Sequence, residues 1–94
     1  MQAETVRVDG LPVRYDLLPE SLRGGAQRYI EHGIPMGIFL HAVASNDLFT
    51  AVVCADKVNL ANIRQLVLWW HDYAPPDCHG SAEKVQAWME GRNV

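Results

Sequence analysis

The stretch Tyr29–Asp56, which reads YIEHGIPMGIFLHAVASNDLFTAVVCAD, determines how the middle of the chain folds. Gly33-Ile34-Pro35 ends one helix and begins another, because glycine accepts the left-handed conformation past a helix end and proline suits the first helical position. Ser45-Asn46-Asp47 breaks the chain again and supplies a cap for the next helix. The segment between these breaks is apolar on almost every side, which predicts a short buried helix beginning at Pro35.

Four further helices are predicted around this segment. Apolar residues recur there at helical spacing, and polar capping residues, glycines or prolines mark the ends. The predicted ranges are about 20–32, 48–58, 60–73 and 82–91. The helix over 48–58 is expected to turn Leu48, Ala51, Val52 and Ala55 inward, and Asn59 and Ser81 are expected to cap the two helices that follow.

The N-terminal residues 5–15, TVRVDGLPVRY, are predicted to form a β-hairpin. Asp9-Gly10 supplies the pair with positive φ that a two-residue turn prefers, and the flanking residues alternate between apolar and polar. The expected fold is therefore mostly α within an α+β class. It is a single domain over residues 1–94, in which the hairpin precedes a compact bundle of four to five helices over residues 20–91.

Composition excludes several classes of function. The chain has 94 residues, of which 49% are hydrophobic and 20% charged, and its net charge is −3. Lys and Arg are few and scattered, which argues against direct nucleic-acid binding because phosphate contacts need clustered cations. The apolar runs are too short for a membrane span. Two cysteines and no signal-peptide pattern indicate a reducing cytoplasm.

Metal-binding and catalytic side-chain types are present but poorly spaced. Cys78 and His79 are adjacent, and Cys54 is isolated, whereas zinc sites usually show paired ligands at short spacing. A thiol nucleophile would need a base and a third orienting group. We therefore predict no catalytic residue, no metal and no cofactor. A small enzyme that uses Cys78 with His71 or His79 remains an alternative.

The charge pattern of the same central stretch indicates an interaction surface. Tyr29–Asp56 contains Glu31, Asp47 and Asp56 but no Lys or Arg, and Asp72 lies in a second stretch without bases. If these acids share a face, they would attract a basic partner and steer its association. A normal solvated surface is the alternative.

The pair Trp69-Trp70 suggests an anchor for that surface. Adjacent residues on a helix point about 100° apart, so the two indoles cannot both lie in the centre of one helix stripe. Trp70 fits the inner stripe, and Trp69 is expected to be half exposed, as tryptophans at binding hot spots often are. Alternatively, Trp69 packs under the hairpin or the last helix.

The combined pattern resembles a group of small proteins encoded in phage and prophage genomes. It comprises Tyr29-Ile30-Glu31-x-Gly33-Ile34-Pro35-x-Gly37-x-Phe39-Leu40-x-Ala42-Val43, Asn46-Asp47-Leu48, Ala55-Asp56, Asn59, Ala74-Pro75, Cys78-x-Gly80-Ser81, Val85 and Trp88. The chain departs from the group at Met36, Ala44 and Cys54, and Cys54 replaces a frequent arginine. The resemblance implies a mobile-element origin and the cytoplasm of a bacterial host. The group offers no activity to transfer.

These observations lead us to expect a non-enzymatic inhibitor of a host defence complex, with an anti-CRISPR protein as the specific hypothesis. Its partner would be a host protein complex such as a CRISPR–Cas effector. An acidic, aromatic-edged surface would cover a basic nucleic-acid channel of this target. The residues expected to bind the partner are Glu31, Asp47, Asp56, Trp69 and Asp72. One alternative is a regulatory or accessory module of phage gene expression that binds DNA through the helix pair around residues 45–47, and a homodimer is also open.

Overall fold

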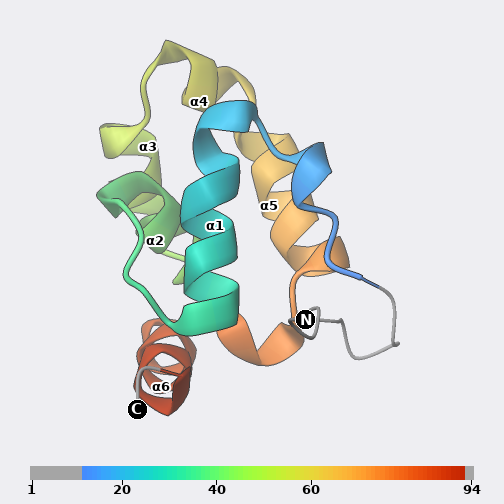
Figure 1. Ribbon diagram of the computed structural model, residues 1–94. Coiled ribbons are helices and arrows are strands. Elements are labelled where there is room, and N and C mark those ends of the chain that lie inside the picture. The colour runs from blue at the N-terminus through green and yellow to red at the C-terminus, as the bar shows by residue number, and fades with distance from the viewer. Residues whose placement is uncertain (1–11, 93–94) are drawn as a thin grey trace.

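A computed structural model describes residues 12–92, which form six α-helices and two short 3₁₀ turns and contain no strand. The helices are α1 (Glu20–His32), α2 (Ile38–Ala44), α3 (Leu48–Cys54), α4 (Lys57–Ala61), α5 (Ile63–Tyr73) and α6 (Ala82–Arg92). The 3₁₀ turns are η1 (Tyr15–Leu17) and η2 (Pro76–Cys78). Figure 1 shows α1 between α2 and α5, with α4 beyond one end of α1 and α6 beyond the other. The prediction of a compact, mostly helical fold is confirmed.

The predicted hairpin is not seen. Its residues 5–11 lie outside the described part of the chain, and none of residues 12–15 belongs to a strand. Tyr15 instead begins η1, where the backbone N–H of Leu18 donates to the Tyr15 carbonyl at 3.0 Å. The Arg14 guanidinium pairs with the Asp16 carboxylate at 2.8 Å. This local pairing, together with the burial of Val13, favours a turn over a strand here.

Helix α1 begins and ends where the sequence predicts. Gly33 follows it with φ of 69°, and its N–H donates to the Tyr29 carbonyl at 2.9 Å, which satisfies one of the free carbonyls of the last turn. Helix α2 begins at Ile38, three residues later than predicted from Pro35. The chain uses residues 34–37 to cross from the end of α1 to the start of α2 (Figure 1), so these residues cannot be helical.

The predicted helix over 48–58 is divided into α3 and α4. The Asp56 carboxylate accepts the backbone N–H of Asn59 at 2.7 Å and so caps α4. Asn59 itself lies inside α4 and is not the cap that the sequence suggests. Asp47 caps α3 as predicted, accepting the Thr50 N–H at 3.2 Å. Two short capped helices therefore replace one longer helix, and α5 begins at Ile63.

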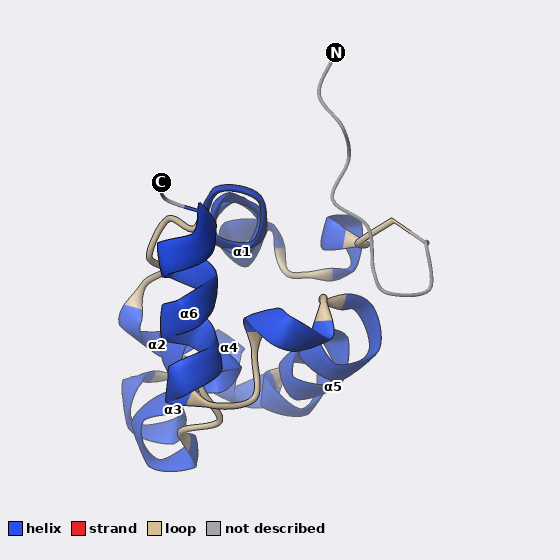
Figure 2. Cartoon of the chain, turned by 90° about the horizontal axis from the view of Figure 1, so that it is seen from below, coloured by secondary structure: helices blue, strands red, loops and turns tan. Residues whose placement is uncertain are grey.

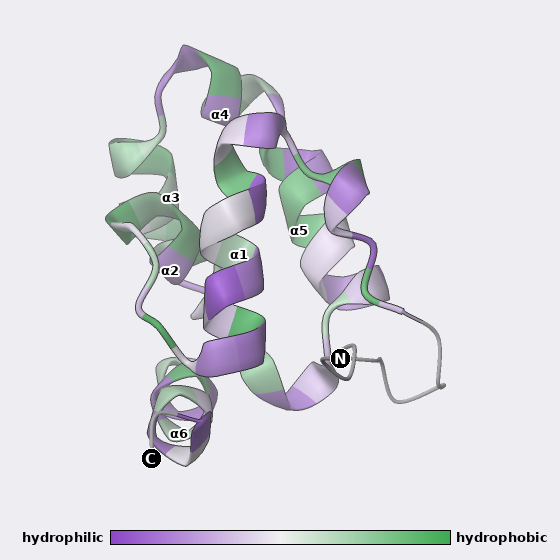
Figure 3. Ribbon diagram, in the orientation of Figure 1, coloured by the Kyte–Doolittle hydropathy of each residue, from purple (hydrophilic) through white to green (hydrophobic). Residues whose placement is uncertain are grey.

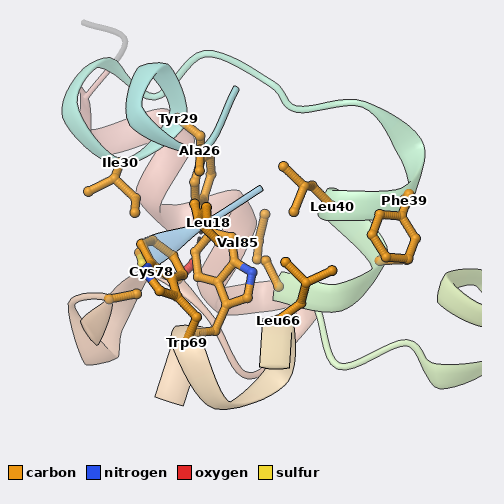
Figure 4. Packing of buried hydrophobic residues seen from close by; sticks show 14 of the residues in the cluster. Leu18, Ala26, Tyr29, Ile30, Phe39, Leu40, Leu66, Trp69, Cys78 and Val85 are labelled. Atoms are coloured by element: carbon orange, nitrogen blue, oxygen red, sulfur yellow. Dashed lines mark hydrogen bonds between the residues drawn. The ribbon is translucent and has the colours of Figure 1, made fainter. Parts of the chain in front are cut away.

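The core gathers side chains from α1, α2, α5, η2 and α6 (Figure 4). Trp70 is 2% exposed, and its ring meets those of Trp69 and Tyr29 edge-on, at centroid distances of 5.2 and 6.1 Å. The Tyr29 hydroxyl donates to the Cys78 carbonyl at 2.6 Å. This bond joins α1 to the segment before α6 and satisfies the one polar atom that Tyr29 brings into the core.

Helix α6 closes the lower end of the molecule, beside α1 and α2 (Figure 2). The indole N–H of Trp88 donates to the Ile30 carbonyl at 3.1 Å and to the Tyr29 carbonyl at 3.3 Å. These carbonyls belong to the last turn of α1, where the helix leaves such groups without partners. As predicted, Ser81 caps α6: its hydroxyl accepts the Lys84 N–H at 3.1 Å. None of the helices within residues 12–92 has both the length and the apolar character needed to cross a membrane.

Candidate protein-interaction site

An unusually apolar surface lies on α3 and its neighbours. Leu48 and Phe49 are 74% and 77% exposed, although side chains of this type usually lie inside a protein. Figure 3 marks much of α2, α3 and α5 as hydrophobic. We call the exposed apolar side chains here the α3 face; they are Ile38, Leu48, Phe49, Val52, Val53, Val67 and Leu68. A contiguous apolar surface on a small protein commonly marks an interaction site.

A groove of about 310 Å³ lies between α2, α3 and α5, and four side chains of the α3 face line it: Leu48, Val52, Val67 and Leu68. Its lining is almost entirely apolar: Ala42, Val43, Leu48, Ala51, Val52, Ile63, Val67 and Leu68, with Asn46, Asp47 and Arg64 as its polar residues. Asp47 and Arg64 are the charged groups among these lining residues. Hydrogen bonds from Thr50 hold the pKa of Asp47 below its ordinary value, so this carboxylate is charged at neutral pH. An apolar groove with a few fixed polar groups is typical of a recognition site.

The predicted inner stripe of α3 is wrong for Leu48 and Val52, both of which are exposed. Ala51 alone is buried in this helix. Helix α3 packs chiefly against α2, and most of its other side chains remain exposed. Helix α2, which was predicted to be buried all round, is buried at Phe39, Leu40, Ala42 and Ala44 but not at its start. Its first residue, Ile38, is 69% exposed because α2 begins at the edge of the bundle.

The structure places the four predicted acids at the ends of four helices. Glu31 lies in the last turn of α1 and accepts the Gln27 side-chain amide at 3.2 Å. Asp47 and Asp56 precede α3 and α4 as caps, so they stand at the two ends of α3. Asp72 lies near the end of α5 and pairs with His71 at 2.9 Å. Asp47 is the one acid among these four that lines the groove.

Trp69 is not the half-exposed anchor that the sequence suggested. It is 4% exposed, and its indole N–H donates to the Arg14 carbonyl at 2.9 Å. Its ring lies 6.1 Å from that of Tyr15, so the segment before α1 covers it. The alternative prediction, in which Trp69 packs under the hairpin or the last helix, describes its burial better, although Arg14 and Tyr15, which cover it, belong to no strand. Trp69 and Asp72 do meet at a second hollow, lined also by Leu17, Gln65, Leu68 and Tyr73.

The two thiols differ sharply in environment. Cys78 is fully buried, and burial raises the pKa of its thiol to about 12. The reactive thiolate is therefore almost absent at neutral pH, which is the opposite of what a cysteine nucleophile needs. Cys54 is exposed at the end of α3. No group of three His, Cys, Asp or Glu side chains within residues 12–92 is arranged to hold a metal ion.

Maleimide is expected to modify Cys54 and spare Cys78 in dilute native protein, because only an exposed thiol with accessible thiolate reacts quickly. Intact-mass measurement should show one adduct, and a second should follow only in denaturant. Cys54→Ser serves as the control and should gain no adduct while folded. Rapid double labelling of the native chain would show that Cys78 is not enclosed as described.

Sequence reasoning missed Phe49 and Val53, which project from α3 into solvent. One signal was available: residues 48–54 are apolar on more sides than one neighbouring helix can cover. The sequence could not show that the bundle leaves these sides open. Comparisons of the chain with protein-family models, curated proteins and solved structures found no match.

Proposed function

We propose that this protein works by stoichiometric, non-enzymatic binding of another protein through the α3 face. The observation that carries the proposal is the apolar groove beside two strongly exposed side chains, Leu48 and Phe49. Exposing them to water costs free energy, since burial is worth roughly 1.5–3 kcal/mol for a side chain of this size. A partner that covers them recovers this free energy. Aromatic side chains of this kind are typical binding anchors.

The chemistry of the α3 face favours a protein over a nucleic acid or a lipid surface. Lys57 is the one cation within residues 48–61, and Arg64 is the one that lines the groove. A DNA-reading helix needs several cationic or amide side chains directed at phosphates and base edges. A helix that lies on a membrane needs a polar face rich in Lys and Arg. Helix α3 has neither feature.

The proposed partner is a host defence complex, with a CRISPR–Cas effector as the specific candidate. The support for this choice is the resemblance of the chain to phage-encoded proteins. Asp47 and Asp56 stand at the two ends of α3 and would face basic residues around an apolar pocket on the target. This arrangement retains part of the acidic surface and replaces Trp69 by Phe49 as the anchor. Glu31 and Asp72 lie on other helices and are not required.

Phe49→Asp is expected to weaken binding of the partner by at least about 30-fold, because hot-spot residues contribute about 2 kcal/mol or more. Phe49 is exposed in the free protein, so the fold should not suffer. Binding is measured by capturing a defined CRISPR–Cas complex from bacterial lysate on the immobilised protein and titrating the purified complex. Ile34→Asp is the matched control, since Ile34 is an exposed apolar residue that lines neither the groove nor the second hollow. It should bind normally.

A second variant separates the apolar surface from the acidic one. Asp47→Asn with Asp56→Asn removes two charges but keeps side chains that can cap helices. We expect this double variant to bind more slowly and with less salt dependence, while keeping most of its affinity. If it loses binding and Phe49→Asp does not, then the acidic groups carry recognition and the α3 face does not.

A further inference from the structure

We infer that, in the free protein, the α3 face is covered by a second copy of the same chain. The two copies form a symmetric dimer in which α3 of each lies against the groove of the other. The inference concerns the same surface as the proposed function and therefore rests on it in part. It adds a specific occupant, and it explains how so apolar a surface is kept from water before a target is met.

The shape of the α3 face suits a two-fold arrangement. Phe49 and Val53 are four residues apart, so they lie one above the other on α3 and form a ridge. The groove runs along the same helix, beside Leu48 and Val52. In a two-fold interface the same surface patch of each copy meets the other. If residue i of one copy contacts residue j of the second, then residue j of the first copy also contacts residue i of the second. Phe49 and Val53 each follow a groove residue by one position, about 100° further round α3, so the ridge borders the groove, and a two-fold arrangement can set each ridge against the opposite groove.

The charges of the groove are also self-complementary. Among the described residues that line it, Asp47 is the anion and Arg64 the cation. A two-fold axis between the copies can place Asp47 of each opposite Arg64 of the other, which forms two ion pairs. A basic surface on a target could pair with Asp47 but would leave Arg64 without a partner. The second copy satisfies both.

The composition of the exposed surface on α3 and α4 is consistent with a dimer. Helices α3 and α4 together bury one side chain, Ala51, and expose Leu48, Phe49, Val52, Val53, Val58 and Leu60. Helices this short are marginal unless tertiary packing supports them. A stable interface needs about 800 Å² from each copy, with an apolar centre and a polar rim. The α3 face, with Asp47 and Arg64 beside it, has that composition.

The test begins with the mass of the purified chain in solution, measured by sedimentation across protein concentrations. The expected species has twice the chain mass of 10.5 kDa. Phe49→Asp should weaken the dimer at least 30-fold and give a monomer, whereas Ile34→Asp should not change its mass. A dimer whose Kd lies well below about 100 μM is the main species at that protein concentration. A wild-type chain that remains monomeric there overturns the inference.

A charge exchange tests the arrangement itself. Asp47→Arg and Arg64→Asp should each weaken self-association at least tenfold, because each places like charges opposite one another. An equimolar mixture of the two variants should recover the dimer, since every pair is then opposite in sign. Asp47→Arg also removes the cap of α3, so the helix content of each variant is checked by circular dichroism. Failure of the folded mixture to pair overturns the two-fold arrangement.

The outcomes keep the two proposals separate. A monomeric wild type whose Phe49→Asp variant loses the target contradicts the dimer and leaves the binding function standing. A wild-type dimer that Phe49→Asp dissociates, with target binding unchanged in that variant, supports the dimer and contradicts the proposed function. A dimer that survives both Phe49→Asp and the single charge reversals must use another surface, which overturns the inference.

Discussion

Trp70→Ala is expected to lower the free energy of unfolding by about 3–5 kcal/mol, the range for removing a large aromatic side chain from a core. Trp70 is 2% exposed and packs edge-on against Trp69 and Tyr29. Its removal leaves a cavity between α1 and α5 that rigid neighbours can fill only in part. A domain of this size has roughly 5–15 kcal/mol of stability in total. Denaturant unfolding followed by circular dichroism measures the loss.

Two further variants identify the cause of this decrease in the free energy of unfolding. The Trp70 indole N–H is buried and has no hydrogen-bond partner among the described residues. Trp70→Phe removes this unpaired group together with some volume, so it should cost clearly less than Trp70→Ala. Gln65→Ala on the same helix changes an exposed side chain and should stay within about 0.5 kcal/mol of wild type. Equal losses for the phenylalanine and alanine variants would contradict a cavity as the main cause.

Gly33→Ala is expected to cost about 2–5 kcal/mol through two separate effects. Gly33 has φ of 69°, and a left-handed conformation costs a residue with a Cβ about 1–2 kcal/mol. A Cβ there would also lie 2.9 Å from the Met89 carbonyl oxygen and 3.0 Å from the Arg92 Cβ. These contacts involve the backbone of α6, which cannot move without disturbing the Trp88 bonds to α1, so overpacking adds about 1–3 kcal/mol.

Gly37→Ala is the matched control for this effect. Gly37 has φ of −62°, and a Cβ built on it meets nothing within 4 Å. Alanine at such a position should be neutral or should stabilise the protein by up to about 1 kcal/mol through the unfolded state. Thermal unfolding of both variants provides the comparison. A Gly33→Ala protein as stable as Gly37→Ala would mean that α6 does not lie against the end of α1.

Helix ends that depend on local chemistry were predictable from the sequence. Gly33, Asp47 and Ser81 each act within three or four residues of their own position, and each ends or caps a helix as predicted. The break between α3 and α4 depends on equally local chemistry at Asp56. The sequence prediction misses it because Asp56 lies within the predicted helix over 48–58 and Asn59 is the expected cap. The carboxylate three residues before Asn59 was the stronger signal.

The candidate site was less predictable because burial depends on distant parts of the chain. Trp69 is covered by residues near Arg14, which precede it by 55 positions, and no helical periodicity contains that information. Leu48 and Val52 have the spacing of an inner stripe, yet no described helix lies over them. The charge pattern identifies four acids but not their distribution over four helix ends. Asp47 alone of them lines the groove.

Helices α3 and α4 together bury a single side chain, that of Ala51, and this affects how the molecule moves. A segment that contributes so little to the core can open while α1, α5 and α6 stay folded, since the cost of a local opening scales with the contacts it breaks. We therefore expect residues 48–61, which form α3 and α4, to sample several arrangements in the native state. A partner that binds α3 and α4 selects one of these arrangements and restrains the segment in it. Ordering this segment consumes part of the binding free energy. A variant in which residues 48–61 are already rigid in the bound conformation should therefore bind more tightly without any new contact.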